Sequence, residues 1–324
     1  MKDAFGRTVD YLRISLTDKC NLRCRYCIPK EGVALVPHKE ILTFEEIETV
    51  ARVMAGLGLK KIRLTGGEPL VRRDAEKLVA ALAKIPGIEE LCLTTNGLLF
   101  CERAEALKRA GLDRVNFSLD SVDDETFFKI TGSRSADKVL QAVQRALDLG
   151  FVVKINCVAC EWNKNELCKI ALLAKEWPID ARFIELMPIG CARGMTGLSC
   201  DFVLRALEEA FGKAQECPAA PRSPARLYQF KGFKGRIGLI TPVTRAFCDS
   251  CGRLRLTSDG MLKPCLCDDS LFDIKKILRS AKSQEQINRA LQEEIFKALA
   301  SKPKAGALNL NKNAISKSMS EIGG

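Results

Sequence analysis

The sequence predicts an α/β protein: a partial (β/α)6 TIM-like barrel followed by a smaller C-terminal domain. Short β-like segments alternate with longer helical ones from the start of the chain to about residue 190. Repeated βα units imply parallel strands joined by right-handed crossovers, which leaves either an open doubly wound sheet or a barrel. A separate cysteine group lies beyond the proline-containing segment Glu216–Arg226, which we interpret as a linker, and it predicts the second domain.

The expected elements follow one another in regular order. Six strands are expected at Tyr11–Thr17, Lys61–Thr65, Leu91–Thr95, Val115–Asp120, Val152–Val158 and Ala181–Met187. The first helix is expected to begin at Thr43, where Thr-Phe-Glu-Glu forms a capping box. Further helices are expected at Asp74–Lys84, Glu102–Ala110, Asp137–Leu149 and Asn163–Glu176, with a C-terminal helical stretch at Ile274–Ser301.

The faces of the strands favour a barrel over a doubly wound sheet. A doubly wound sheet buries both faces, so its strands would be almost continuously hydrophobic. Here one face is apolar and the other carries Arg13, Arg63, Asn116, Ser118, Asp120, Lys154 and Asn156. A lumen that binds a polar ligand accommodates that face, and six units predict an incomplete barrel. The sixth strand fits less well, because Arg182 and Glu185 face opposite ways.

Composition indicates a cytoplasmic protein with an anionic partner. No apolar run approaches the roughly 20 residues that span a bilayer, and the N-terminal residues lack the apolar core of a secretory signal. The net charge of +11 suits a nucleic acid or a phosphorylated metabolite. Fifteen cysteines in such a chain indicate metal binding or catalysis, while the single histidine, His38, argues against histidine-based zinc sites.

The first chemical motif is the CxxxCxxC loop formed by Cys20, Cys24 and Cys27. It follows the first expected strand directly, where barrel enzymes place their active sites. Three thiols on a [4Fe–4S] cluster, which is usually held by four, leave one iron open to a ligand. A zinc site is the alternative, but zinc prefers four ligands and His38 is an implausible fourth.

The second motif, Gly66-Gly67-Glu68-Pro69, follows the second expected strand. Glycine lets the backbone approach a ligand closely, and Glu68 could accept hydrogen bonds from a ligand amine.

The third motif comprises Cys248 and Cys251, with Cys265 and Cys267 further along the chain. Four thiols suit a closed zinc ribbon, whereas three would again leave an open iron. Arg253 and Arg255 lie beside this group, and guanidinium groups match phosphate oxygens in bidentate fashion.

The cysteine loop, with Tyr26 before its last cysteine, and the GGEP turn resemble the signature of the radical S-adenosylmethionine (SAM) superfamily. More specifically, the chain resembles the GTP 3′,8-cyclase (MoaA) family of molybdenum cofactor biosynthesis over essentially its whole length. The resemblance rests on DYLRISLTDKCNLRCRYCIPKEG, KKIRLTGGEPLVRRD, LTTNGLL, VNFSLDSVD, RFIELMPIG, GRIGLITPVT, FCDSCGRLRLTSDGMLKPCL and the terminal Gly323-Gly324.

The resemblance implies a radical SAM core at residues 1–218 and an auxiliary-cluster and GTP-binding domain at 219–324. It implies two [4Fe–4S] clusters, held by Cys20, Cys24 and Cys27 and by Cys248, Cys251 and Cys265. Cys267 is an extra thiol, although the spacing from Cys251 favours Cys265. The residues matching the family's SAM contacts are Tyr26, Gly67, Ser118 and Met187. Those matching its GTP contacts are Arg13, Arg63, Thr94, Lys154, Arg253 and Arg255, with Arg182 a weaker candidate.

The implied activity is the radical cyclisation of GTP to 3′,8-cyclo-7,8-dihydro-GTP, begun by hydrogen abstraction from ribose C3′. The implied partners are a reductive electron donor and, downstream, the cyclic pyranopterin monophosphate synthase. No membrane or nucleic-acid partner is expected, and the oligomeric state, a homodimer included, is left open. The last residues, 318–324, read as a flexible tail, whereas the family's double-glycine tail reaches toward the active site.

Two other functions remain open from the sequence. One is a peptide-modifying radical SAM enzyme with auxiliary clusters, although such enzymes usually carry more C-terminal cysteines and lack the arginine pair. The other is a basic zinc-ribbon protein that binds nucleic acid in a salt-dependent manner.

Overall fold

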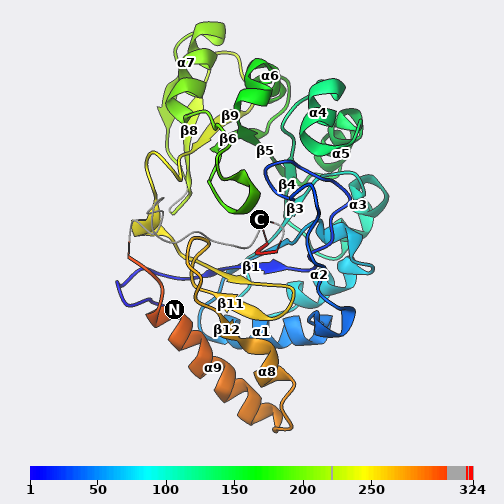
Figure 1. The fold of residues 1–324 in the computed structure, drawn as a ribbon, viewed down its shortest axis with the longest axis vertical. Helices are drawn as coiled ribbons and strands as arrows, with labels where there is room; N and C mark the ends of the chain where they lie inside the picture. The colour runs from blue at the N-terminus through cyan, green and yellow to red at the C-terminus, as the bar shows by residue number, and fades with distance from the viewer. Residues whose placement is uncertain (220–221, 305–318, 320, 324) are drawn as a thin grey trace.

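A computed structural model describes residues 1–219, 222–304, 319 and 321–323, and its centre is one long curved sheet (Figure 1). Six strands pair in chain order and in parallel, and their bounds lie within two residues of the predicted ones. They are β1 (Tyr11–Ser15), β2 (Lys61–Thr65), β3 (Glu90–Thr95), β4 (Arg114–Ser118), β5 (Val152–Ala159) and β6 (Asp180–Glu185). The described strands form an open sheet, which confirms the partial barrel.

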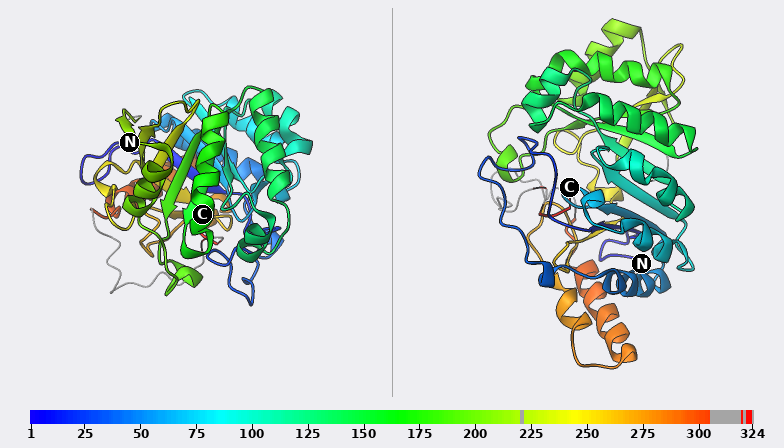
Figure 2. Two further views of the ribbon diagram at one scale, coloured as in Figure 1. Left: turned by 90° about the horizontal axis from the view of Figure 1, so that it is seen from above. Right: turned by 90° about the vertical axis from the view of Figure 1, so that its right-hand side faces the viewer.

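Helices cover the outer face of this sheet (Figure 2). They are α1 (Phe44–Gly56), α2 (Ala75–Ala83), α3 (Phe100–Arg109), α4 (Asp124–Thr131), α5 (Ala136–Asp148), α6 (Leu167–Glu176) and α7 (Cys200–Phe211). The capping box at Thr43 is present, with Glu46 Oε2 accepting from the Thr43 amide at 2.7 Å. The helices α4 and α7 were not predicted, and the helix expected from Asn163 is α6, preceded by a 3-10 turn.

The C-terminal region extends the same sheet at both of its ends. After β6 come β9 (Arg236–Ile240), β8 (Ala225–Gln229) and β7 (Gln215–Cys217); beside β1 lie β10 (Arg253–Leu256), β11 (Met261–Lys263) and β12 (Phe272–Asp273). Both β9 and β10 are parallel to the core strands. The linker prediction for 216–226 is therefore wrong at its two ends, which belong to β7 and β8 and pair antiparallel with each other. A three-residue strand such as β7 is too short to show an alternating pattern in the sequence. A boundary at residue 218 stays a prediction.

The predicted C-terminal helical stretch consists of two helices, α8 (Ile274–Leu278) and α9 (Gln284–Ala300). They pack against each other and against β11 and α1 at the lower end of the molecule in Figure 1. Among the described residues, no helix is both long and apolar enough to cross a bilayer.

The hydrophobic core lies between the sheet and its outer helices. Leu12, Ile14, Val115 and Phe117 are fully buried there, as their alternation along the strands predicted. Phe117 contacts Phe100 of α3 edge to face, with ring centroids 5.0 Å apart. This one-sided core leaves the polar strand face for the lumen.

Candidate active site

The three-cysteine loop begins just after β1, at the carboxyl end of the parallel strands. The amides of Cys27 and Ile28 both donate to the Cys24 carbonyl at 2.9 Å, which turns the loop back on itself. Burial raises the pKa of the Cys24 thiol, and the neighbouring thiols of Cys27 and Cys20 raise it further. The three predicted ligands therefore lie close enough together to affect one another's ionisation.

The glycines of the GGEP turn pack against this loop. A Cβ atom on Gly67 would lie 2.4 Å from the Lys19 carbonyl oxygen, and the Gly67 amide donates to the Thr17 carbonyl at 2.7 Å. The glycine was expected to let the backbone approach a ligand closely; here it also lets the turn approach the main chain that carries Cys20.

Glu68 is bound by the protein itself. Its carboxylate accepts hydrogen bonds from the Leu70 amide, from the Thr95 hydroxyl at 2.8 Å and from the Asn96 amide at 2.7 Å. Burial raises its pKa to about 7. Glu68 therefore joins the turn to the end of β3, a role that differs from the expected contact with a ligand amine.

Tyr26, inside the cysteine loop, is held by a carboxylate that the sequence analysis placed only on a polar face. Asp120, just after β4, accepts from the Tyr26 hydroxyl at 2.6 Å and from the Val158 amide at 2.8 Å. Burial raises the pKa of Asp120 to about 6. The loop is thereby tied to the ends of both β4 and β5.

The remaining residues expected to contact SAM lie at the same end of the barrel. Ser118 is the last residue of β4 and is half-buried. Met187 lies just beyond β6 and packs beside Ile189, Ile322 and Cys267. Since the C-terminal ends of parallel strands share one edge, the four predicted SAM contacts come together at one rim.

Three arginines form a row across adjacent strands on the lumen face. The strand register places Arg13 of β1 opposite Arg255 of β10 on one side and Arg63 of β2 on the other. Burial lowers the pKa of Arg13, and the nearby Arg255 guanidinium lowers it further. For Arg255 itself, burial and Arg253 lower the pKa to about 10. Such crowding of buried like charges costs free energy, which a bound polyanion would offset.

The weaker candidate Arg182 joins this group. With its amide oxygen turned toward them, Asn116 accepts from Arg63 at 2.9 Å and from Arg182 at 2.5 Å. Thr94 accepts from the same Arg63 guanidinium at 3.3 Å. Arg182 therefore faces the lumen arginines, whereas Glu185 accepts from the Cys200 amide at 3.1 Å, so the two side chains face opposite ways as expected.

Lys154 forms an ion pair with a carboxylate. Its ammonium lies 2.5 Å from Asp180, which also pairs with Arg236 at 2.9 Å. Lys154 stands opposite Asn116 in the register of β4 and β5, so it borders the arginine group.

The second cysteine group lies around β10. Cys248 begins a 3-10 turn before this strand, Cys251 directly follows the turn, and Cys265 follows β11. A hydrogen bond from the Cys267 thiol lowers the pKa of Cys265 to about 6, with Lys302 and Arg255 contributing. Arg253 lies over the Phe247 ring at 4.9 Å, and its charge lowers the pKa of Cys251 against the effect of burial.

The described part of the C-terminal tail is buried against the lumen. Ile322 is 1% exposed, and the Gly323 carbonyl accepts from Arg255 at 2.8 Å. A flexible tail is therefore the wrong prediction for residues 321–323, whose partners lie far away in sequence; residues 318, 320 and 324 lie outside the described residues. Figure 1 shows this red segment near the centre of the fold.

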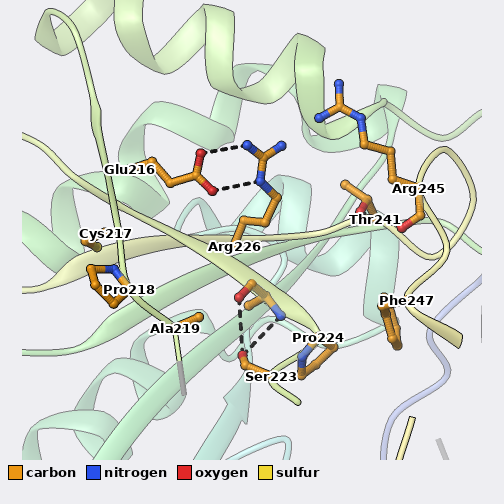
Figure 3. A pocket seen from close by; sticks show the side chains of 11 residues that line it. Glu216, Cys217, Pro218, Ala219, Ser223, Pro224, Arg226, Thr241, Arg245 and Phe247 are labelled. Carbon is orange, nitrogen blue, oxygen red and sulfur yellow. Dashed lines mark hydrogen bonds and ion pairs between the residues drawn. The ribbon is translucent and has the colours of Figure 1, made fainter. Parts of the chain in front are cut away.

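Two cavities lie apart from the arginine row. One of about 320 Å³ opens beside Cys20 and Asn21. The other, of about 590 Å³, lies between β7, β8 and Phe247 (Figure 3). Its charged residues are already paired, Arg226 with Glu216 at 2.7 Å and Arg245 with Asp201 at 3.0 Å. Because the lumen holds the crowded cations, it fits an anionic substrate better than this larger cavity.

Within residues 1–219, 222–304, 319 and 321–323, no three His, Cys, Asp or Glu side chains are grouped to hold a single metal ion. A four-iron cluster is a larger body that spaces its thiolates more widely. Cysteine thiolates are the usual ligands of such clusters, so each set of three thiols, which lies beside buried cationic or polar side chains, fits one cluster.

Comparison with known proteins decides the family. Residues 14–174 match the Radical SAM superfamily, and residues 179–308 match the family described as Molybdenum Cofactor Synthesis C. A GTP 3′,8-cyclase of Alkaliphilus metalliredigens is 45% identical over 330 residues, covering all of both chains. This chain belongs to the GTP 3′,8-cyclase family.

Other relatives agree with this family. The GTP 3′,8-cyclase of Desulforamulus reducens is 44% identical over 94% of both chains. Among solved structures, Streptococcus suis SuiB bound to S-adenosylmethionine matches with a TM-score of 0.63 at 14% identity, covering 96% of this chain and 76% of that one. That likeness supports the radical SAM fold alone. As a radical SAM enzyme of the GTP 3′,8-cyclase family, the chain uses SAM and iron–sulfur clusters.

Sequence reasoning missed several residues of this family member's site. Asp120 was on a predicted polar face, but its bond to Tyr26 spans 94 positions. Arg7 and Lys302 contact the second cysteine group from the two ends of the chain. Only their positive charge marked them in the sequence, and many exposed residues share that feature.

Proposed function

We propose that this enzyme cyclises GTP to 3′,8-cyclo-7,8-dihydro-GTP, the first step of molybdenum cofactor biosynthesis. The observation that carries the proposal is the row of guanidinium groups formed by the buried Arg255 and Arg63 with the half-buried Arg13 between them. A triphosphate brings several negative charges, and guanidinium groups match its oxygens bidentately. The family and the radical SAM fold supply the rest of the argument.

The proposed cofactor ligands are the two sets of three cysteines. Cys20, Cys24 and Cys27 would hold the first [4Fe–4S] cluster, and Cys248, Cys251 and Cys265 the second. With SAM bound, the first cluster would supply a 5′-deoxyadenosyl radical for hydrogen abstraction from the ribose. The protein contributes orientation and exclusion of water, since the cysteine loop is held at the barrel rim by Tyr26–Asp120 and by the GGEP turn.

The lumen residues would orient GTP between the two cysteine groups. Arg13, Arg63, Thr94, Lys154 and Arg182 lie on the core strands, and Arg253 and Arg255 on β10 beside the second group. SAM would be contacted at the barrel rim, beside the first cysteine group, by Tyr26, Gly67, Ser118 and Met187. Holding both reactants in one lumen is what a cyclisation requires, because it fixes the ribose and the base relative to the abstracting group.

The proposed reaction also has partners before and after it. The product would pass to a cyclic pyranopterin monophosphate synthase, and a reductive donor would supply electrons. None of the fifteen cysteines, all of which lie in the described part of the chain, forms a disulfide, which suits a reducing cytoplasm.

Anaerobic purification tests the proposal. Reconstituted protein should hold about eight irons per chain, as expected for two four-iron clusters, and should convert GTP and SAM to the cyclic product. A content of about four irons would contradict the two-cluster assignment. Arg13→Met should abolish GTP binding, whereas Arg52→Met, which removes an exposed arginine of α1 that is 52% accessible, should leave it unchanged.

A further inference from the structure

Lys302, two residues beyond α9, is a lysine with its charge inside the protein. The residue is 2% exposed. Its ammonium donates to the Arg253 carbonyl at 2.8 Å, to the Pro264 carbonyl at 2.7 Å and to the Cys251 sulfur at 3.9 Å. An ammonium group has three donors and no acceptor, so three surrounding acceptors suit its charged form.

These contacts join the two segments that carry the second cysteine group. Arg253 lies two residues after Cys251, and Pro264 directly precedes Cys265. One ammonium group therefore bridges the start of β10 to the end of β11. Because two of its three bonds are to main-chain carbonyls, the bridge fixes the backbone from which the thiols project.

Arg7 at the other end of the chain supports the same arrangement. Its guanidinium donates to the Cys248 carbonyl at 2.8 Å and to the Pro303 carbonyl at 2.7 Å. Asp3 holds this guanidinium at 2.5 Å. Since Pro303 is adjacent to Lys302, Arg7 fixes both a cysteine segment and the backbone of the lysine.

The buried charge requires a counter-charge nearby. Removing an ammonium group from water costs several kcal/mol unless a partner compensates it, and a cysteine thiolate is the near candidate. Hydrogen bonds to cluster sulfurs and the local net charge are among the factors that set an iron–sulfur reduction potential. A positive group donating to a ligand sulfur favours the reduced, more negative cluster.

We propose that Lys302 is a positioning residue of the second cluster, which holds the Cys251 and Cys265 segments together and raises the cluster's reduction potential. This inference rests on the proposed ligand role of Cys248, Cys251 and Cys265.

The test uses full-length protein in which Cys20, Cys24 and Cys27 are replaced by Ala, so that only the second cluster remains. Reduction is followed by electron paramagnetic resonance (EPR) with and without Lys302→Met. The matched control is Lys297→Met, which removes an exposed lysine of α9 that is 66% accessible. At one fixed potential, Lys302→Met should lower the reduced-to-oxidised ratio at least tenfold, about 59 mV for a one-electron couple. A ratio equal to that of the control, with full iron, would overturn the proposal.

If Lys302→Met loses iron, its reduction potential cannot be measured, and two further measurements test the proposal. Lys302→Arg keeps a cation and should restore loading. If Lys302→Arg holds as little iron as Lys302→Met, a positive charge is not what joins the two cysteine segments, and the proposal is overturned. In protein with the natural Lys302 and ¹⁵Nζ-labelled lysine, pulsed EPR of the reduced second cluster should show a nitrogen coupling that Lys302→Arg removes. Absence of that coupling overturns the inference. If the protein without Cys20, Cys24 and Cys27 holds no iron even with the natural Lys302, the assignment of Cys248, Cys251 and Cys265 as cluster ligands fails instead.

Discussion

The contact between Gly67 and the cysteine loop predicts the effect of a single added methyl group. In Gly67→Ala, the new Cβ would lie 2.4 Å from the Lys19 carbonyl oxygen, 2.6 Å from its carbon and 2.7 Å from the Asp18 carbonyl oxygen. Ordinary contact begins near 3.4 Å, so the loop would have to retreat by about 1 Å (3.4 − 2.4). All three atoms belong to the main chain and cannot rotate away as a side chain could.

We expect this overpacking to cost about 1–3 kcal/mol of unfolding free energy, the usual range for an inserted methyl group in a packed site. Lys19 precedes Cys20, so the displacement should also reduce loading of the first cluster. Urea unfolding of the cluster-free protein measures the first effect, and iron counting after anaerobic reconstitution measures the second. Iron should fall from about eight toward about four per chain, because the second set of ligands is untouched.

Gly56→Ala provides the matched control. Gly56 is the last residue of α1, and a Cβ there would meet no atom within 4 Å. Removing glycine's backbone freedom from a helix should stabilise the protein by about 0.5–1 kcal/mol. If Gly67→Ala unfolds and binds iron as the unaltered protein does, the packing argument is refuted.

Three further predictions concern buried charges. Arg182→Met should leave the ligand-free protein as stable as before or more stable, because burial and Arg63 already lower the pKa of Arg182 to about 10. The same change should weaken GTP binding about tenfold or more, because a charge-assisted hydrogen bond is lost. Calorimetry that finds unchanged affinity contradicts this. Tyr26→Phe leaves buried Asp120 without one donor and should lower the unfolding free energy of cluster-free protein by about 1–3 kcal/mol in urea titrations. The pKa of Glu68 is about 7 in the folded chain against an ordinary 4.5, so its stabilising contribution is complete below about pH 4.5 and is lost as pH rises through 7, by about 3 kcal/mol in all. Urea unfolding at pH 5 and pH 8 should show this loss in the unaltered protein and a flatter profile in Glu68→Gln.

The site shows how far local sequence patterns extend. Arg13 and Arg63 could be assigned to one lumen face because side chains alternate with a period of two along a strand. Arg255 joins them in the same row only because β10 pairs with β1, more than 200 positions away in the chain. For Arg182, alternation along the strand shows only that it and Glu185 face opposite ways, and the pairing with β5 and β9 shows which side faces the lumen.

The sequence by itself determined the cysteine spacing, the GGEP turn, the six parallel strands and the helix start at Thr43. Each of these depends on residues a few positions apart, whose geometry the backbone largely dictates. The tertiary structure alone decided that the C-terminal strands continue the barrel sheet, that Ile322 and Gly323 lie in the lumen, and that Arg7 and Lys302 hold the second cysteine group. Those contacts join distant segments, and they form because buried charges and main-chain carbonyls must find partners wherever the fold brings them together.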